Sequence, residues 1–207
     1  MSDAARKPFP PNRKESPMKS FAPLAILVLM LLSGPALAHP GHADGLLAGL
    51  GHPYSGLDHA LAILAVGLWA AQQHARDAIW KIPLTFVATM VAGGLLGQAG
   101  FPLPQFEAGI AASVLILGLL VAFSLRMPTP AGMAIVALFA LLHGYAHGAE
   151  APLGAGLAGF VAGFVLSTAS LHGIGTALGW AARNRAEVAL RLGGVGVALA
   201  GAWMALG

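Results

Sequence analysis

Residues 54–72 read YSGLDHALAILAVGLWAAQ, a mostly apolar run close to the length of about 20 residues that crosses a bilayer as a helix. Further apolar segments follow, which we predict at 80–98, 107–125, 131–148, 153–180 and 187–206. Because the loops between them are short, neighbouring helices should run antiparallel. The sequence therefore predicts an all-α, polytopic membrane helix bundle of about six transmembrane helices.

The composition supports a membrane protein. Of 207 residues, 57% are hydrophobic and only 9% are charged, whereas a soluble domain carries about 25% charged residues. Mean hydropathy is +0.76. Cysteine is absent, which excludes disulfides and thiolate metal sites and leaves His, Asp, Glu or backbone groups as metal ligands.

The formal net charge of +3 comes from the first part of the chain. From His39 onward, Lys and Arg balance Asp and Glu. The basic charge therefore gives no support to nucleic acid as a partner.

Residues 1–38 are predicted to be a secretory signal peptide with an N-terminal extension. Met18-Lys19 precedes an apolar run from Phe21 to Leu32, and the stretch ends in an Ala-x-Ala site at Ala38. The alternative is a first transmembrane helix that is retained, but the run is short and Pro35 interrupts it. Cleavage would leave a transmembrane domain of residues 39–207.

The loops predict the orientation. Basic residues fall between the first and second segments, the third and fourth, and the fifth and sixth, while loops 99–106 and 148–153 contain none. The positive-inside rule places the basic loops in the cytoplasm. The mature N-terminus then lies in the periplasm of a bacterial inner-membrane protein, as the signal peptide also requires. Trp69, Trp80 and Trp180 near the cytoplasmic ends, and Trp203 near the periplasmic end, are expected to be interfacial anchors.

Ionisable side chains gather in the predicted spans, where each costs a few kcal/mol on insertion scales and so needs a partner or a task. The first group is His52, Asp58 and His59, with His52 expected at or just before a helix start because Pro53 follows it. The second is His143, His147 and Glu150, whose spacing puts all three on one helical face.

His172 is predicted deeper in the membrane, in the fifth span. Imidazoles with a few carboxylates suit Ni, Zn, Cu or Fe and argue against Mg²⁺. A metal site is therefore expected from His52, Asp58, His59, His143, His147, Glu150 and His172, with Asp58 and Glu150 as ligands or as groups that orient imidazoles. A proton relay and a structural network remain alternatives for the cluster, and a helix–helix contact for His172.

The remaining histidines are weighed separately. His39 and His42 could capture metal at the entrance, or could belong to a solvated terminus. His74 is expected to be a solvated loop residue, and Gln98 and Glu107 are expected to need no special role.

These motifs resemble the HupE/UreJ family of nickel permeases and accessory proteins. The HxxxxxDH signature corresponds to His52, Asp58 and His59, and HGxAHGxE corresponds to residues 143–150. Leu142 stands where the family usually has an aromatic residue. The resemblance implies supply of nickel, or sometimes cobalt, to hydrogenase or urease, with these positions as the metal route.

No phosphate-binding loop is present in the sequence, so a secondary or facilitated uptake permease is expected, and not an enzyme. The expected partners are the transported Ni²⁺ or Co²⁺ and the lipid bilayer, with an indirect link to hydrogenase or urease maturation proteins. No prosthetic group is expected, and a homo-oligomer remains open. The alternatives are a metal-binding accessory protein without transport, or a membrane-embedded metalloenzyme with Glu150 as base.

Overall fold

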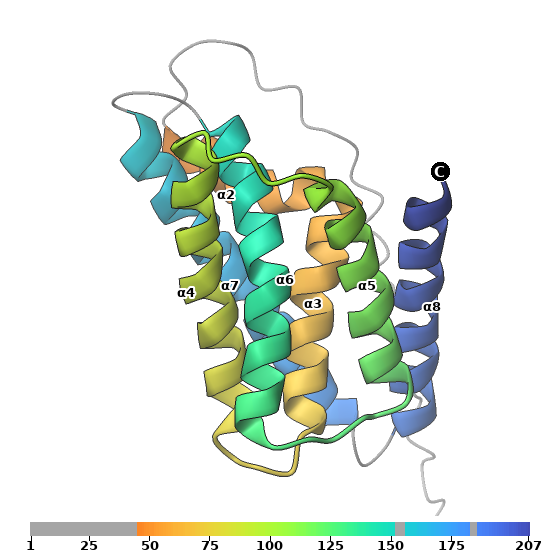
Figure 1. Ribbon diagram of the computed structural model, residues 1–207. Helices are drawn as coiled ribbons and strands as arrows, with labels where there is room; N and C mark the ends of the chain where they lie inside the picture. Colours follow the sequence, from red (N-terminus) through yellow and green to blue (C-terminus); the bar gives the residue numbers. More distant parts are fainter. Residues whose placement is uncertain (1–44, 152–155, 183–185) are drawn as a thin grey trace, which may run out of the picture. The chain divides into compact units, whose positions relative to one another are not determined.

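The computed structural model describes residues 45–151, 156–182 and 186–207, which belong to one compact unit. The predicted signal peptide of residues 1–38, and His39 and His42, lie outside the described residues. Within the described ranges the structure is all-α (Figure 1). Its helices are α2 (Gly45–Ser55), α3 (Leu57–Gln72), α4 (Ala78–Gln98), α5 (Phe106–Ala122), α6 (Thr129–Glu150), α7 (Leu157–Ala182) and α8 (Glu187–Leu206).

Each predicted apolar segment is a helix, from α3 to α8, so the all-α membrane bundle is confirmed. By length and composition, 4 of the described helices can cross a membrane alone: α4, α6, α7 and α8. The count rises to 5 if the bent pair of α2 and α3 forms one span. The helix α5 is shorter, with 17 residues, because Ser124 adopts a positive φ of 48° just beyond its end. The described part therefore contains four to five candidate spans by this measure, fewer than the six predicted.

The helix α2 corrects the predicted start of the first segment. His52 lies inside α2 together with Pro53, not at or before a helix start. The chain breaks at Gly56, which is extended (φ −110°, ψ 119°), and α3 begins there at an angle of 83° to α2. Packing explains why α2 persists: a Cβ on Gly49 would overlap the Phe160 carbonyl oxygen, so α2 lies directly on the α7 backbone.

Glycine pairs hold the longer helices together, as their small-xxx-small spacing indicates. A Cβ on Gly144 would overlap the Met90 carbonyl oxygen, and one on Gly148 would overlap the Gly94 carbonyl oxygen. The backbones of α4 and α6 are therefore in contact. This contact fixes the rotation of α6 about its own axis and so the direction in which its histidines point.

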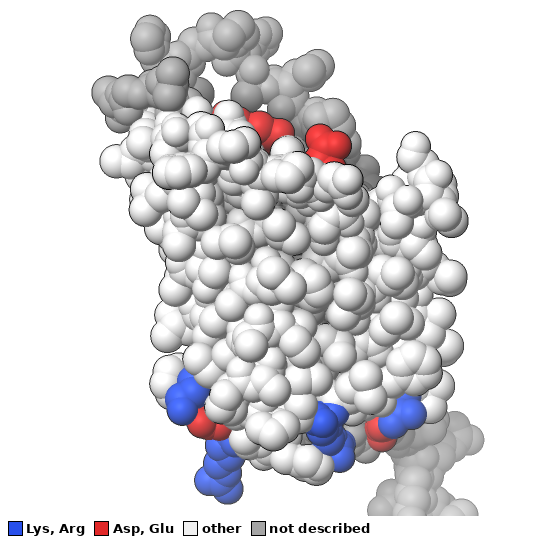
Figure 2. Space-filling view, in the orientation of Figure 1, with Lys and Arg blue, Asp and Glu red and all other residues white. Residues whose placement is uncertain are grey.

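The two ends of the bundle differ in charge. Among the described residues visible in Figure 2, Lys and Arg lie at the lower end, while the acidic residues at the upper end have no described basic residue beside them. The described basic residues are Arg76 in the loop after α3, Lys81 in the first turn of α4, Arg126 in the loop before α6 and Arg191 near the start of α8.

Trp69 lies near this basic end, but the prediction that it is an interfacial anchor is wrong. Its side chain is fully buried, and its indole Nε1–H donates to the Leu125 carbonyl oxygen at 2.7 Å. It therefore ties α3 to the loop after α5. Trp80, Trp180 and Trp203 are more than half exposed on the bundle surface, as the anchor role requires.

Candidate metal site

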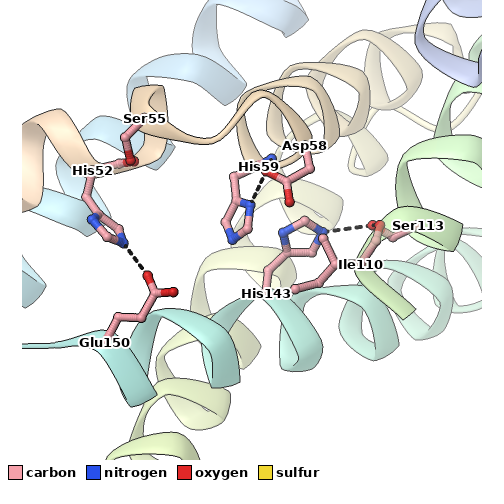
Figure 3. A network of polar contacts seen from close by, with 8 residues as sticks. All are labelled: His52, Ser55, Asp58, His59, Ile110, Ser113, His143 and Glu150. Carbon is pink, nitrogen blue, oxygen red and sulfur yellow. Dashed lines mark hydrogen bonds and ion pairs between the residues drawn. The ribbon is translucent and has the colours of Figure 1, made fainter. Parts of the chain in front are cut away.

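The helix termini at the end of the bundle opposite the basic residues bring the predicted site residues together. The last turn of α2 supplies His52, and the first turn of α3 supplies Asp58 and His59. The last two turns of α6 supply His143, His147 and Glu150. The break at Gly56 is what allows His52 and His59, from two helices at a steep angle, to face the same helix α6 (Figure 3).

Four imidazoles form a continuous chain across the site. The ring centroids of His52 and His147 are 4.7 Å apart, those of His147 and His59 are 4.1 Å apart, and those of His59 and His143 are 4.8 Å apart. The spacing of His143 and His147 predicted that they share one face of α6, and this is confirmed because both rings contact His59.

Two of these imidazoles and a nearby carboxylate could bind one cation together. One ligand atom from each of His52, His147 and Glu150 lies within 4.8 Å of the others. The Nε2 atom of His52 is 3.5 Å from Oε2 of Glu150. The Glu150 side chain is 68% exposed, so the group is open to solvent on one side.

Hydrogen bonds orient two of the other imidazoles. The Nδ1–H of His59 donates to Oδ1 of Asp58 at 2.6 Å, and the backbone N–H of His59 donates to the same oxygen at 2.8 Å. The Nε2 atom of His143 lies 2.8 Å from Oγ of Ser113 on α5 (Figure 3). Ser113 was not among the predicted site residues, because a single serine in an apolar helix carries no signal of its own.

Several ring nitrogens at the site have no hydrogen-bond partner in the described part of the chain. Among the described residues, neither nitrogen of His147 has a hydrogen-bond partner, nor does Nδ1 of His143, and all three atoms are buried. A buried polar atom without a partner costs about 1–3 kcal/mol, so such atoms are rare without a ligand or a water molecule. The nitrogens are the donor type that Ni²⁺, Co²⁺ and Zn²⁺ accept, so the residues fit a late first-row cation.

A cavity of about 320 Å³ adjoins the site, and Glu107 is part of its wall. The expectation that Glu107 needs no role rested on its place at a helix end. The fold brings it to a cavity that already holds two other carboxylates and an imidazole. The lining residues are Asp58, His59, Glu107, Ile110, Ala111, Ala146, Glu150 and Met204.

His172 lies apart from this cluster, as predicted from its position in the fifth span. Its Nδ1–H donates to the Ile63 carbonyl oxygen at 2.8 Å, and its buried Nε2 has no partner in the described part of the chain. The fully buried Phe86 is next to both, with its ring centroid 5.0 Å from that of His172 and 6.0 Å from that of His143.

The fold and the site define a class: a multi-pass membrane protein with a buried histidine cluster at one end of its helix bundle. The family described as HupE / UreJ protein matches residues 27–204, and this chain belongs to that family. It is 46% identical to Protein HupE of Rhizobium leguminosarum bv. viciae over 183 residues, which cover 87% of this chain and 95% of that protein. No solved structure matches the chain.

Proposed function

We propose that this chain is a secondary or facilitated uptake permease for Ni²⁺, with Co²⁺ as a second substrate, and that it supplies hydrogenase or urease maturation. The single observation that carries the proposal is His147, a buried imidazole with both nitrogens free of partners in the described structure and with His52, His59 and Glu150 beside it. Membership of the HupE/UreJ family supports it.

The donor set supports a transition metal over Mg²⁺. Mg²⁺ prefers an octahedral shell of oxygens and keeps several waters, whereas imidazole suits Ni²⁺ and Co²⁺. The carboxylates have two roles in this proposal. Glu150 binds the cation directly together with His52 and His147, while Asp58 orients His59 so that Nε2 of that ring faces the metal.

The arrangement supports passage into the bundle. The cation would leave water at the cavity lined by Asp58, Glu107 and Glu150, cross the imidazole chain and reach His172. Phe86 is fully buried and adjoins both His143 and His172, so we expect this ring to move when the cation passes from one to the other.

The proposed orientation places the histidine end in the periplasm and the basic end in the cytoplasm of a bacterial inner membrane. The charge difference between the two ends supports it. Residues 1–38 would be removed as the signal peptide, and His39 and His42 would capture the metal at the entrance.

Uptake of radioactive nickel by cells that express variants of this chain tests the proposal. At low external nickel, His59→Ala and His147→Ala should each lower uptake to the level of cells without the protein. His74→Ala is the matched control, because His74 is an exposed histidine at the basic end and should leave uptake unchanged. Wild-type uptake by His147→Ala, with the protein present in the membrane, would contradict the role of the cluster.

Flux into proteoliposomes separates the proposal from its two rivals. Purified chain in liposomes should carry Ni²⁺ inward without ATP. Nickel binding without flux would favour a metal-binding accessory protein, for which the burial of Phe86 beside His143 and His172 is the supporting observation. Metal-dependent hydrolysis without flux would favour a metalloenzyme.

A further inference from the structure

Ser113 is a fully buried hydroxyl on α5 that contacts the histidine cluster from outside the two sequence motifs. Its Oγ atom lies 2.6 Å from the Ile110 carbonyl oxygen, one turn earlier in the same helix. The same Oγ atom lies 2.8 Å from Nε2 of His143. Figure 3 shows Ser113 and His59 on opposite sides of the His143 ring in this view.

The positions of the protons follow from the chemistry of these three groups. A carbonyl oxygen can only accept, so the one hydroxyl proton of Ser113 is donated to Ile110. The Oγ atom must then accept at its other contact, which makes Nε2 of His143 the donor. In a neutral imidazole one nitrogen carries the proton and the other carries a lone pair. Nδ1 of His143 is therefore the atom with the lone pair.

We propose that Ser113 is a positioning residue that holds His143 as the Nε2–H tautomer and so presents Nδ1 to the transported cation. The inference rests on the proposed function and deepens it, because it assigns the ligand atom of one histidine and the residue that selects it. Nδ1 of His143 is buried and has no other partner among the residues that the structure describes. In the opposite tautomer this atom would carry a proton and could not bind a cation.

Two other histidines are held in the same manner by other acceptors. Oδ1 of Asp58 accepts the Nδ1–H of His59, and the Ile63 carbonyl oxygen accepts the Nδ1–H of His172. In each case a group outside the ring selects the nitrogen that keeps its lone pair. Ser113 differs in that it selects Nδ1 and not Nε2, and it joins α5 to the histidine cluster by a side-chain hydrogen bond.

Histidine ¹⁵N NMR of the full-length chain in lipid nanodiscs, without metal, tests the tautomer. The His143 resonances are assigned by their loss in His143→Gln. In the wild-type chain we expect a protonated Nε2 and an unprotonated Nδ1 for His143. In Ser113→Ala we expect a mixture of both tautomers. A protonated Nδ1 in the wild-type chain, or an unchanged tautomer in Ser113→Ala, would overturn the proposal.

Nickel titration of the same samples tests the consequence. Loss of a group that orients a metal-binding histidine typically weakens metal affinity by about 10- to 100-fold, and we expect a weakening in this range for Ser113→Ala. Ser170→Ala is the matched control: Ser170 also donates to a carbonyl oxygen of its own helix, that of Leu166, at 2.8 Å, but it is exposed. We expect its nickel affinity to equal that of the wild-type chain.

The two failures can be told apart. If Ser113→Ala binds Ni²⁺ as tightly as the wild-type chain, the role of Ser113 is refuted while the proposed function stands. If the wild-type chain binds no Ni²⁺, the proposed function fails, and the role of Nδ1 fails with it.

Discussion

Each histidine of the cluster has a different set of neighbours, and the sequence alone could not distinguish their roles. His59 is held by a carboxylate, His143 by a hydroxyl, and His147 by ring contacts alone within the described structure. His147 also packs on Phe164, with ring centroids 4.3 Å apart. An imidazole with no hydrogen bond to lose can turn toward a cation at low cost, which suits His147 to the centre of the site.

Asp58→Asn tests whether this carboxylate orients His59. Asparagine has the same size but can present its NH₂ group to Nδ1, which would favour the wrong tautomer of His59. We expect nickel affinity, measured by titration of the purified chain, to fall by about 10- to 100-fold without loss of the folded protein.

Glu187→Gln is the control for the charge change in Asp58→Asn. Glu187 is also a carboxylate in the first turn of a helix, and it pairs with Arg191 at the opposite end of the bundle. Nickel affinity should not change in this variant. An equal loss of affinity in both variants would mean that the effect of Asp58→Asn is general and not local to His59.

Sequence spacing could predict which residues share a helix face but not which helices face each other. The i, i+4 spacing of His143 and His147 determined their common direction in advance. Ser113 and Glu107 could not be found in this way, because their place at the site depends on how α5 is rotated against α3 and α6. That rotation is set by packing between residues far apart in the chain.

At the scale of the helices, close backbone contact between α4 and α6 positions the second motif. We predict that Gly144→Ala destabilises the protein by about 1–3 kcal/mol, because its new Cβ would overlap the Met90 carbonyl oxygen. Gly193→Ala on α8 is the matched control, since an added Cβ there meets nothing within 4 Å. The higher helix propensity of alanine should stabilise this variant by up to about 1 kcal/mol.

Thermal unfolding of both glycine variants in the same detergent, at one scan rate, provides the measurement. The propensity gain is the same for two glycines inside helices, so the difference in Tm isolates the packing between α4 and α6. Equal shifts in Tm would show that this contact contributes nothing to stability. Because His143 precedes Gly144, we also expect the nickel affinity of Gly144→Ala to fall.

The helix α2 is the element that the sequence could not predict. Its 11 residues are too few to span a bilayer, and Pro53 argues against a helix at His52. What stabilises α2 is contact with α7, through Gly49 against Phe160 and Gly163 against Leu46. Residues more than a hundred positions apart decide this element, so local propensity could not predict it.

At the scale of the whole molecule, the described basic residues and the histidine cluster lie at opposite ends of the helix bundle. The described basic residues lie at one end of the bundle, and the histidine cluster with Asp58 and Glu150 lies at the other. Ser124, Gln72 and Gln73 join α3 to the loop after α5 at the basic end, through bonds such as that from Gln73 Nε2 to the Leu125 carbonyl oxygen at 3.1 Å. These bonds hold the loop after α5 against the end of α3, beside a cavity of about 340 Å³ that Gln72, Gln73 and Ser124 help to line.

The proposed orientation can be tested with single cysteines, because the natural chain has none and gives no background. Phe101→Cys lies in the loop between α4 and α5, where Phe101 is 60% exposed. Ala75→Cys lies in the exposed loop between α3 and α4, at the basic end. Because loops with Lys and Arg resist translocation, we expect that end to lie in the cytoplasm. A membrane-impermeant maleimide added to intact spheroplasts should therefore label Phe101→Cys at once, and Ala75→Cys only after lysis. Labelling of Ala75→Cys in intact spheroplasts would reverse the orientation, and the histidine cluster would then face the cytoplasm as a site of release or export.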